Sequence, residues 1–212
     1  MLNQVQIGPR RGNVTDVQVA RAGRDVDTIV SALHGRYYET TRYGKMFNAA
    51  NQVHVTVGPA GVNPNAYTGL AISNPPTSTV VAVLHRATIM QEVVQSATFA
   101  AFAVGIGFST TSFATQGTLT PVAVQPCLVG SGNTGQVVAE IAMGASPAFP
   151  AALTYHTFVA DTPTAAQDVF ADVVDFEGSL ILLPGAYAAW ITPIASIATS
   201  MWLSFQWEEV PL

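Results

Sequence analysis

The chain has 212 residues, of which 49% are apolar and only 10% are charged, and its formal net charge is −5. This length suits one sizeable domain, and a charged share far below the roughly 25% usual for soluble domains indicates that other subunits cover part of the surface. The single cysteine, Cys127, excludes an intrachain disulfide and therefore a disulfide-stapled secreted fold. The N-terminal stretch is too polar for a secretory signal.

Basic residues gather near the N-terminus. Residues 1–45 hold seven basic and four acidic side chains, a net charge of +3, whereas residues 46–212 hold Arg86 and nine acids, a net charge of −8. Such asymmetry is typical of an arm that binds an acidic partner, although a solvated leader would have the same composition. We therefore expect a basic N-terminal arm with its connecting segment over residues 1–45 and a folded domain over residues 46–212.

The first part of the chain alternates only weakly and is broken by glycine and proline, which predicts an extended arm over residues 1–22. Residues 25–34 place apolar side chains at helical spacing and predict one short helix. Residues 35–47, GRYYETTRYGKMF, interleave tyrosine with arginine and lysine. Such a pattern can bind nucleic acid by stacking and phosphate contact, but Tyr and Arg are also enriched in protein interfaces, and we favour an interface or core role.

Beyond this point, short β-branched and apolar runs are separated by Gly, Pro, Ser and Asn, and about eight to ten short strands are expected. They are predicted at residues 49–57, 70–73, 79–89, 96–108, 118–129, 136–143, 152–160, 179–183, 186–191 and 199–210. Residues 130–135 are expected to form a hairpin tip, and the acidic stretch 161–177 a solvated face. The fold class predicted is all-β, a jelly-roll-like antiparallel β-sandwich with an extended N-terminal arm and one short helix.

Alternation also predicts which side chains face the core. In the strand from residue 79, one face would hold Val81, Val83, His85 and Ala87, and the other Val80, Ala82, Leu84 and Arg86. In the last strand the buried face would hold Met201, Leu203, Phe205 and Trp207, with Trp202, Ser204, Gln206 and Glu208 on the other side.

Catalytic and ligand-binding motifs are missing from the sequence. The four histidines are scattered without metal-ligand spacing, no nucleophile elbow occurs, and Gly105-x-Gly107 has no βαβ surroundings. The uncharged stretch 178–206 could span a bilayer by length, but Pro184 and Pro193 divide it. We expect a non-enzymatic protein with no metal, no cofactor and no membrane span.

Three pieces of sequence, in this order, carry a family resemblance: GRYYETTRYGKMF, AISNPPTSTVVAVLHRATI and LLPGAYAAW…LSFQWEEVPL. Together they resemble jelly-roll virion structural proteins of tailed bacteriophages, of the head-decoration or cement kind. The resemblance implies a homotrimer, made in the host cytoplasm, that binds the major capsid protein on the virion surface without direct contact with nucleic acid.

In that interpretation the capsid contacts come from the basic residues and tyrosines of residues 1–45. The residues expected to make them are Arg10, Arg11, Arg21, Arg24, Arg36, Tyr37, Tyr38, Arg42, Tyr43 and Lys45. The alternative is a phage tail or fibre module that binds host-surface glycan, for which Tyr67, Tyr187 and Trp190 would line an aromatic groove.

Overall fold

The computed structural model describes residues 36–55, 69–93, 100–108, 119–142, 153–160, 171–191 and 200–212. By its internal contacts the chain divides into Met1–Tyr38 and Glu39–Leu212. The sequence placed the division later, after Lys45, so Glu39–Lys45 belong by contacts to the larger unit. The expected arm over residues 1–22 and the expected helix over residues 25–34 lie outside the described residues.

The described residues are mostly in strands, with a single five-residue helix, α1 (Tyr38–Arg42), before the first strand. The strands are β1 (Met46–Ala50), β2 (Leu70–Ser73), β3 (Val80–Val93), β4 (Ala100–Phe108), β5 (Leu119–Val122), β6 (Gln125–Pro126), β7 (Val138–Ala142), β8 (Leu153–Ala160), β9 (Ala171–Leu182), β10 (Ala186–Ile191) and β11 (Ser200–Pro211). The all-β prediction is confirmed.

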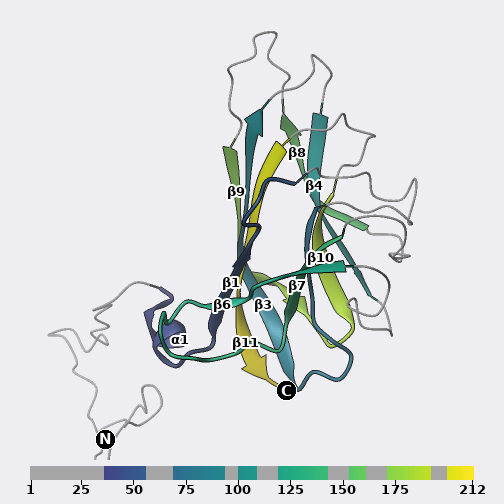
Figure 1. The fold of residues 1–212 in the computed structure, drawn as a ribbon. Coiled ribbons are helices and arrows are strands. Elements are labelled where there is room, and N and C mark those ends of the chain that lie inside the picture. The colour runs from purple at the N-terminus through teal and green to yellow at the C-terminus, as the bar shows by residue number, and fades with distance from the viewer. Residues whose placement is uncertain are drawn as a thin grey trace, which may run out of the picture. The chain divides into compact units, whose positions relative to one another are not determined.

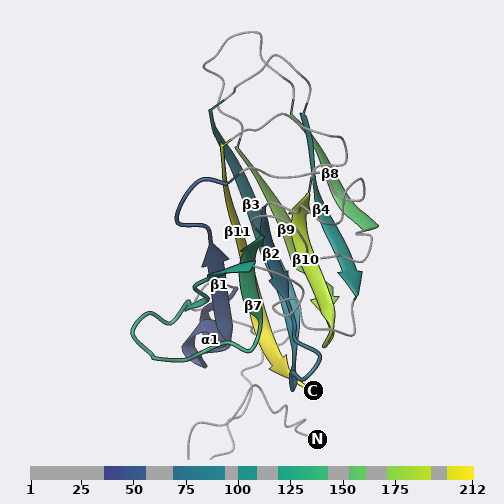
Figure 2. The ribbon, with the colours of Figure 1, turned by 45° about the vertical axis from the view of Figure 1, so that its right-hand side comes forward.

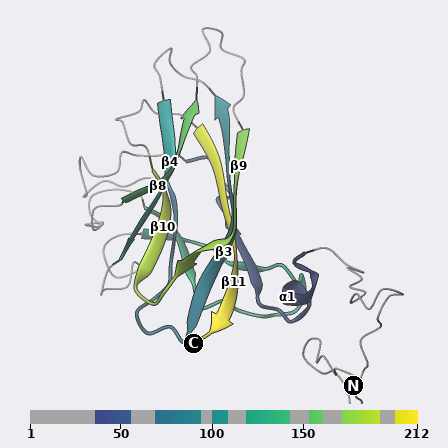
Figure 3. The same ribbon diagram turned by 180° about the vertical axis from the view of Figure 1, so that it is seen from behind.

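Two antiparallel sheets face each other in the larger unit (Figures 1 and 3). The first sheet has the strand order β6-β1-β11-β3-β9, and the second has the order β5-β7-β2-β10-β4-β8. Every strand pair is antiparallel. The predicted antiparallel β-sandwich is therefore confirmed.

The connectivity is that of a jelly roll. When β5, β6 and β7 are set aside, eight strands remain, and numbered along the chain they lie in the orders 1-8-3-6 and 2-7-4-5. This is the strand order of a jelly roll, in which two Greek keys together form the two sheets. Strands β5 to β7 are an insertion between the fourth and fifth of these strands. It widens each sheet at one edge, because β6 pairs with β1 and β7 pairs with β2.

The core lies between the two sheets and is rich in aromatic side chains. Trp190 from the second sheet and Phe205 from the first have ring centroids 6.0 Å apart, and Phe47 stacks on Trp207 at 6.3 Å. The predicted buried face of the last strand is confirmed, since Met201, Leu203, Phe205 and Trp207 are all at most 2% exposed. Strand β11 pairs with both β1 and β3 and so lies inside the first sheet.

Strand β3 departs from the predicted alternation at His85. Leu84 pairs with Trp207 and Arg86 pairs with Gln206, so β3 has one extra residue, His85, between two consecutive positions of β11. Beyond this β-bulge the faces exchange, and Ala87 and Ile89 join the core while Arg86 is exposed. The predicted faces are thus correct up to His85, whose ring lies near the same Gly178 position as Val83, and wrong from Arg86 onward. One extra residue reverses the alternation of a strand.

Two other predicted strands were misplaced. The first was expected over residues 49–57, but β1 ends at Ala50 and Val53 is exposed. The reason is Asn51, whose side chain replaces ladder bonds: its Nδ2 donates to the Met201 carbonyl at 2.9 Å, and its Oδ1 accepts from the Leu203 amide at 2.6 Å. The other, expected over 179–183, is the end of β9, which begins at Ala171 and includes part of the acidic stretch.

Candidate attachment surface

Four of the expected contact residues, Arg10, Arg11, Arg21 and Arg24, lie outside the described residues. In the smaller unit, Arg36 is exposed and its guanidinium carbon lies 5.3 Å from the centre of the Tyr37 ring. A cation at this distance from an aromatic face is attracted by the ring quadrupole. Tyr38, the first residue of α1, is partly exposed.

The remaining three contact residues come together at the end of α1. The amides of Tyr43, Gly44 and Lys45 donate to carbonyls of the helix, at 2.9–3.0 Å, and close its last turn. Gly44 has φ +68°, the left-handed conformation that ends helices and that glycine adopts without strain. Arg42, Tyr43 and Lys45 are all exposed, so this turn presents two cations and a phenol to solvent.

A loop over residues 127–135 lies against this turn (Figures 1 and 2). The Cys127 amide donates to the Met46 carbonyl at 2.8 Å, and the Asn133 side-chain amide donates to the Gly44 carbonyl at 3.3 Å. Leu128 is partly exposed and Val129, at the tip, is 92% exposed. The prediction of a hairpin tip at residues 130–135 is wrong, because β6 before the loop and β7 after it belong to different sheets.

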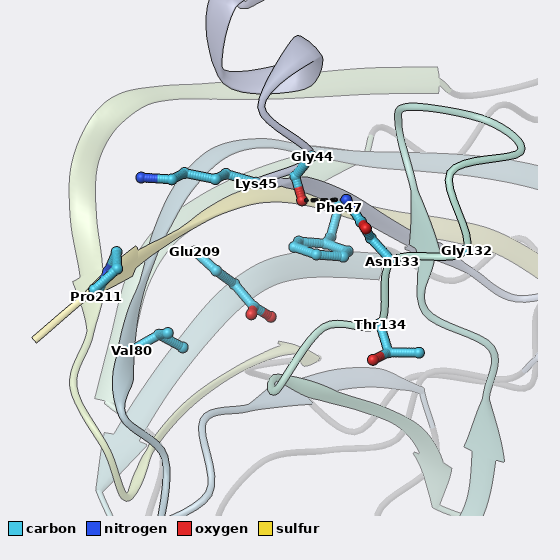
Figure 4. Close-up of a pocket in the computed structure, with 9 residues that line it drawn as sticks. All are labelled: Gly44, Lys45, Phe47, Val80, Gly132, Asn133, Thr134, Glu209 and Pro211. Atoms are coloured by element: carbon cyan, nitrogen blue, oxygen red, sulfur yellow. Dashed lines mark hydrogen bonds between the residues drawn. The ribbon is translucent and has the colours of Figure 1, made fainter. Parts of the chain in front are cut away.

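Between the turn and the loop lies an open pocket of about 430 Å³ (Figure 4). Its lining comprises Gly44, Lys45, Phe47, Val80, Gly132, Asn133, Thr134, Glu209 and Pro211. The Lys45 ammonium group points away from the Glu209 carboxylate rather than toward it. The lining of the pocket therefore includes one carboxylate, one basic side chain and the apolar side chains of Phe47, Val80 and Pro211.

Glu209 holds the loop to the last strand. Its carboxylate accepts the Gln136 amide on both oxygens, at 2.9 Å each, and the Val137 amide on Oε1 at 3.0 Å. The Trp207 indole N–H lies 3.4 Å from the same Oε1. A carboxylate that accepts several N–H groups is well satisfied in a buried position. Glu209 therefore has a structural role that its sequence position does not reveal, because the two backbone amides that it accepts lie 72 and 73 residues away.

Burial raises the pKa of three groups, Glu140, Tyr187 and Cys127. Desolvation raises the pKa of the Glu140 carboxyl to about 7, and one of its oxygens has no hydrogen-bond partner. Desolvation also raises the pKa of the Tyr187 phenol. The pKa of the Cys127 thiol is raised by burial, an effect partly offset by the Gln206 side-chain amide at 3.8 Å.

The aromatic groove expected for glycan binding does not form from the residues considered. Trp190 is fully buried in the core, and Tyr187 is only 1% exposed and lies with its ring over Gly107. Neither side chain can stack on a sugar without rearrangement of the sheet. Tyr67 lies outside the described residues.

Within the described ranges, no group of three or more His, Cys, Asp or Glu side chains is placed to hold a metal ion. Among the same residues, no helix is long and apolar enough to cross a membrane. Comparisons of the chain with protein-family models, with curated proteins and with solved structures found no match.

Proposed function

We propose that the protein is a non-enzymatic structural protein of a bacteriophage virion, a cement protein that binds the assembled head. The observation that carries the proposal is the jelly-roll strand order together with the charge split between residues 1–45 and 46–212. Jelly rolls occur in viral capsid and lectin domains and in cupins, and fold alone does not choose among these. The basic N-terminal segment on an acidic sandwich favours attachment to an acidic protein shell.

The contact to the major capsid protein would combine the basic arm with the attachment surface, which we define as Arg42, Tyr43, Lys45 and residues 127–135. Two exposed cations and a phenol beside an exposed Val129 suit an acidic surface with a shallow apolar depression. A clip that binds only assembled shell stabilises it by mass action, and three arms linked in a trimer would add avidity. Nucleic acid and membrane have no part in this proposal.

The alternative is a tail or fibre module that binds glycan, and the burial of Trp190 and Tyr187 weakens it. Counting the copies of this protein in purified virions by quantitative mass spectrometry separates the two. A head cement is expected in hundreds of copies, whereas a tail component follows the tail's rotational symmetry and is expected at about a dozen. A count near a dozen would contradict the cement assignment.

A further inference from the structure

The outer face of the first sheet exposes apolar side chains over its two adjoining strands β3 and β9. Met90 on β3, Val173 and Ile181 on β9, and Leu183 just beyond β9 are between 45% and 56% exposed. Isolated exposed apolar residues are ordinary, but a group on neighbouring strands is typical of an interaction site. We call this surface, with the charged residues between its apolar ends, the β3–β9 face.

The β3–β9 face has an apolar–charged–apolar pattern along the strands. Near one end, Val173 lies opposite Thr88 in the ladder, with Met90 two residues further along β3; near the other end, Ile181 lies opposite Val83. Between them Arg86 lies opposite Asp175, and the Arg86 Nη2 and Asp175 Oδ2 atoms are 3.7 Å apart. Both side chains of this ion pair are roughly half exposed. A half-turn about an axis that lies in the face and runs along the strands between β3 and β9 places Arg86 of one copy over Asp175 of the other, and each apolar end over the same end of the other copy. The face is therefore complementary to itself.

The edge of β9 is less suited to binding than the face. Glu177 and Gly178 both have positive φ, +50° and +82°, where β9 bulges away from the regular ladder. Bulges and charged residues on an edge strand discourage the addition of another strand. Asp175 and Glu177 are exposed along this part of the strand. Contact through side chains is therefore favoured over strand-to-strand pairing.

We propose that a second copy of this chain packs on the β3–β9 face about a twofold axis that passes near the Arg86–Asp175 pair. Arg86 of each copy then lies against Asp175 of the other, which gives four alternating charges at the centre, and apolar end meets apolar end. A twofold contact of this kind needs a self-complementary patch. An acidic shell offers no cation to Asp175, whereas a second copy offers Arg86 to each Asp175, so charge complementarity favours a second copy as the occupant.

This contact does not depend on the virion assignment. If the protein is also a trimer, the twofold contact joins two trimers, and if it is not, the contact joins two single copies. A trimer carries three such faces, and two trimers form a closed pair when the twofold axes cross the threefold axis at right angles. In that arrangement, as for single copies, association through the β3–β9 face doubles the mass of the unit. The mass measured at low concentration tests whether the protein is a trimer. A doubling of that mass as the protein is concentrated tests the contact through the β3–β9 face.

Charge reversal at Arg86 and Asp175 gives a pattern of association that is expected only if the two copies meet about a twofold axis. The full-length chain, Arg86→Glu, Asp175→Arg and an equimolar mixture of these two variants are compared by sedimentation over a dilution series. The unsubstituted protein should double its mass as it is concentrated. Each variant alone should not, because it places like charges opposite each other. The mixture should regain the doubling, because the carboxylate introduced in the first variant then meets the guanidinium introduced in the second, and the retained Asp175 of the first meets the retained Arg86 of the second.

Two controls accompany this experiment. The ion pair is exposed and contributes little to folding, so both variants should keep the thermal unfolding midpoint of the parent protein within a few degrees. Ile181→Glu should also abolish the doubling, whereas Val129→Glu, an equally apolar-to-acidic change on the 127–135 loop, should not. The proposal is overturned if the parent protein keeps one mass throughout, if the variants double as it does, or if the mixture fails to regain the doubling.

Discussion

At the scale of single residues, Trp207 connects the core with the loop that carries the attachment surface. It is fully buried, stacks on Phe47, and its indole N–H lies near the Glu209 carboxylate that holds residues 136 and 137. The burial of Trp207 could be predicted from the alternation in the last strand, because a regular strand has two faces and only one face of this strand is apolar. Its contact with Glu209 could not be predicted, because it depends on a loop from a different part of the chain.

Replacement of Trp207 by alanine should therefore lower the free energy of unfolding by about 3–5 kcal/mol, the usual cost of deleting a large buried aromatic side chain. Urea unfolding followed by circular dichroism measures this cost. The matched control is Trp202→Ala, on the opposite and partly exposed face of the same strand, which should cost much less. Equal losses for the two variants would show that the two faces of β11 do not differ in burial.

Glu140 is a second residue whose environment the sequence did not reveal. It lies on β7 opposite Ala71 of β2 and Pro121 of β5 and is 3% exposed. Its neighbours Ala139 and Ile141 belong to the core, so Glu140 faces the other side of the sheet. Burial without full hydrogen bonding raises the pKa of its carboxyl from 4.5 to about 7. Between these two pH values the Glu140 carboxyl is therefore protonated in the folded protein and ionised in the unfolded chain.

Because the folded-state pKa is the higher one, Glu140 imposes no cost below pH 4.5, and stability falls as the pH rises toward about 7. The full shift corresponds to roughly 3 kcal/mol. Glu140→Gln should match the parent protein at pH 4.5 and exceed it in unfolding free energy at pH 8, by up to that amount. Denaturant titrations at both pH values test this, and a difference that does not change with pH would contradict it.

At the scale of elements, the bulge region of β3 and β9 shapes the outer face of the first sheet. Gly178, with φ +82°, sits where a Cβ atom would lie 3.3 Å from the Val83 Cγ1 atom. The two strands therefore approach closely because this position is glycine. The sequence predicted β10 and β11 almost to the residue, since regular alternation and flanking turns define them. The sequence does not locate the bulge at His85, because the bulge depends on how β3 is aligned with its two neighbours, β11 and β9.

Gly178→Ala should cost about 1–2 kcal/mol for the left-handed conformation alone, and more once Val83 is crowded. Gly130→Ala is the control, because Gly130 has nearly the same φ, +83°, but nothing within 4 Å of the added Cβ. The difference between the two unfolding free energies isolates the crowding between β3 and β9. A smaller loss at Gly178 than at Gly130 would mean that the strands relax around the methyl group.

At the scale of the whole molecule, the sandwich carries few charges for its size. Residues 46–212 contain nine acids and one arginine, and several large apolar side chains are exposed among the described residues. This composition and the family resemblance both led to the expectation of a homotrimer. Sedimentation equilibrium at micromolar concentration should give the mass of three copies. A stable single copy under these conditions would contradict the trimer and leave the doubling test of the β3–β9 face unaffected.

The charge split of the chain bears on the proposed attachment to a phage head. Seven of the eight basic residues lie within residues 1–45, and four of these precede the described residues. An arm that docks in extended form loses conformational entropy, so it depends on charge and backbone pairing with its partner. Exposed ionic contacts of this kind weaken as salt is added. The attachment surface at Arg42, Tyr43 and Lys45 would contribute a second, smaller set of contacts.

Deletion of residues 1–34 separates the two contributions. The truncated protein should fold, because the unit Glu39–Leu212 contains every strand of both sheets, and it should keep the oligomeric state of the full chain. It should bind empty phage heads far more weakly in a co-sedimentation assay, and the full chain should lose binding as salt is raised. Arg42→Ala/Lys45→Ala in the full chain serves as the comparison and should weaken binding less. If the truncated protein decorates heads as well as the full chain does, the arm is a passive leader and attachment depends on the sandwich.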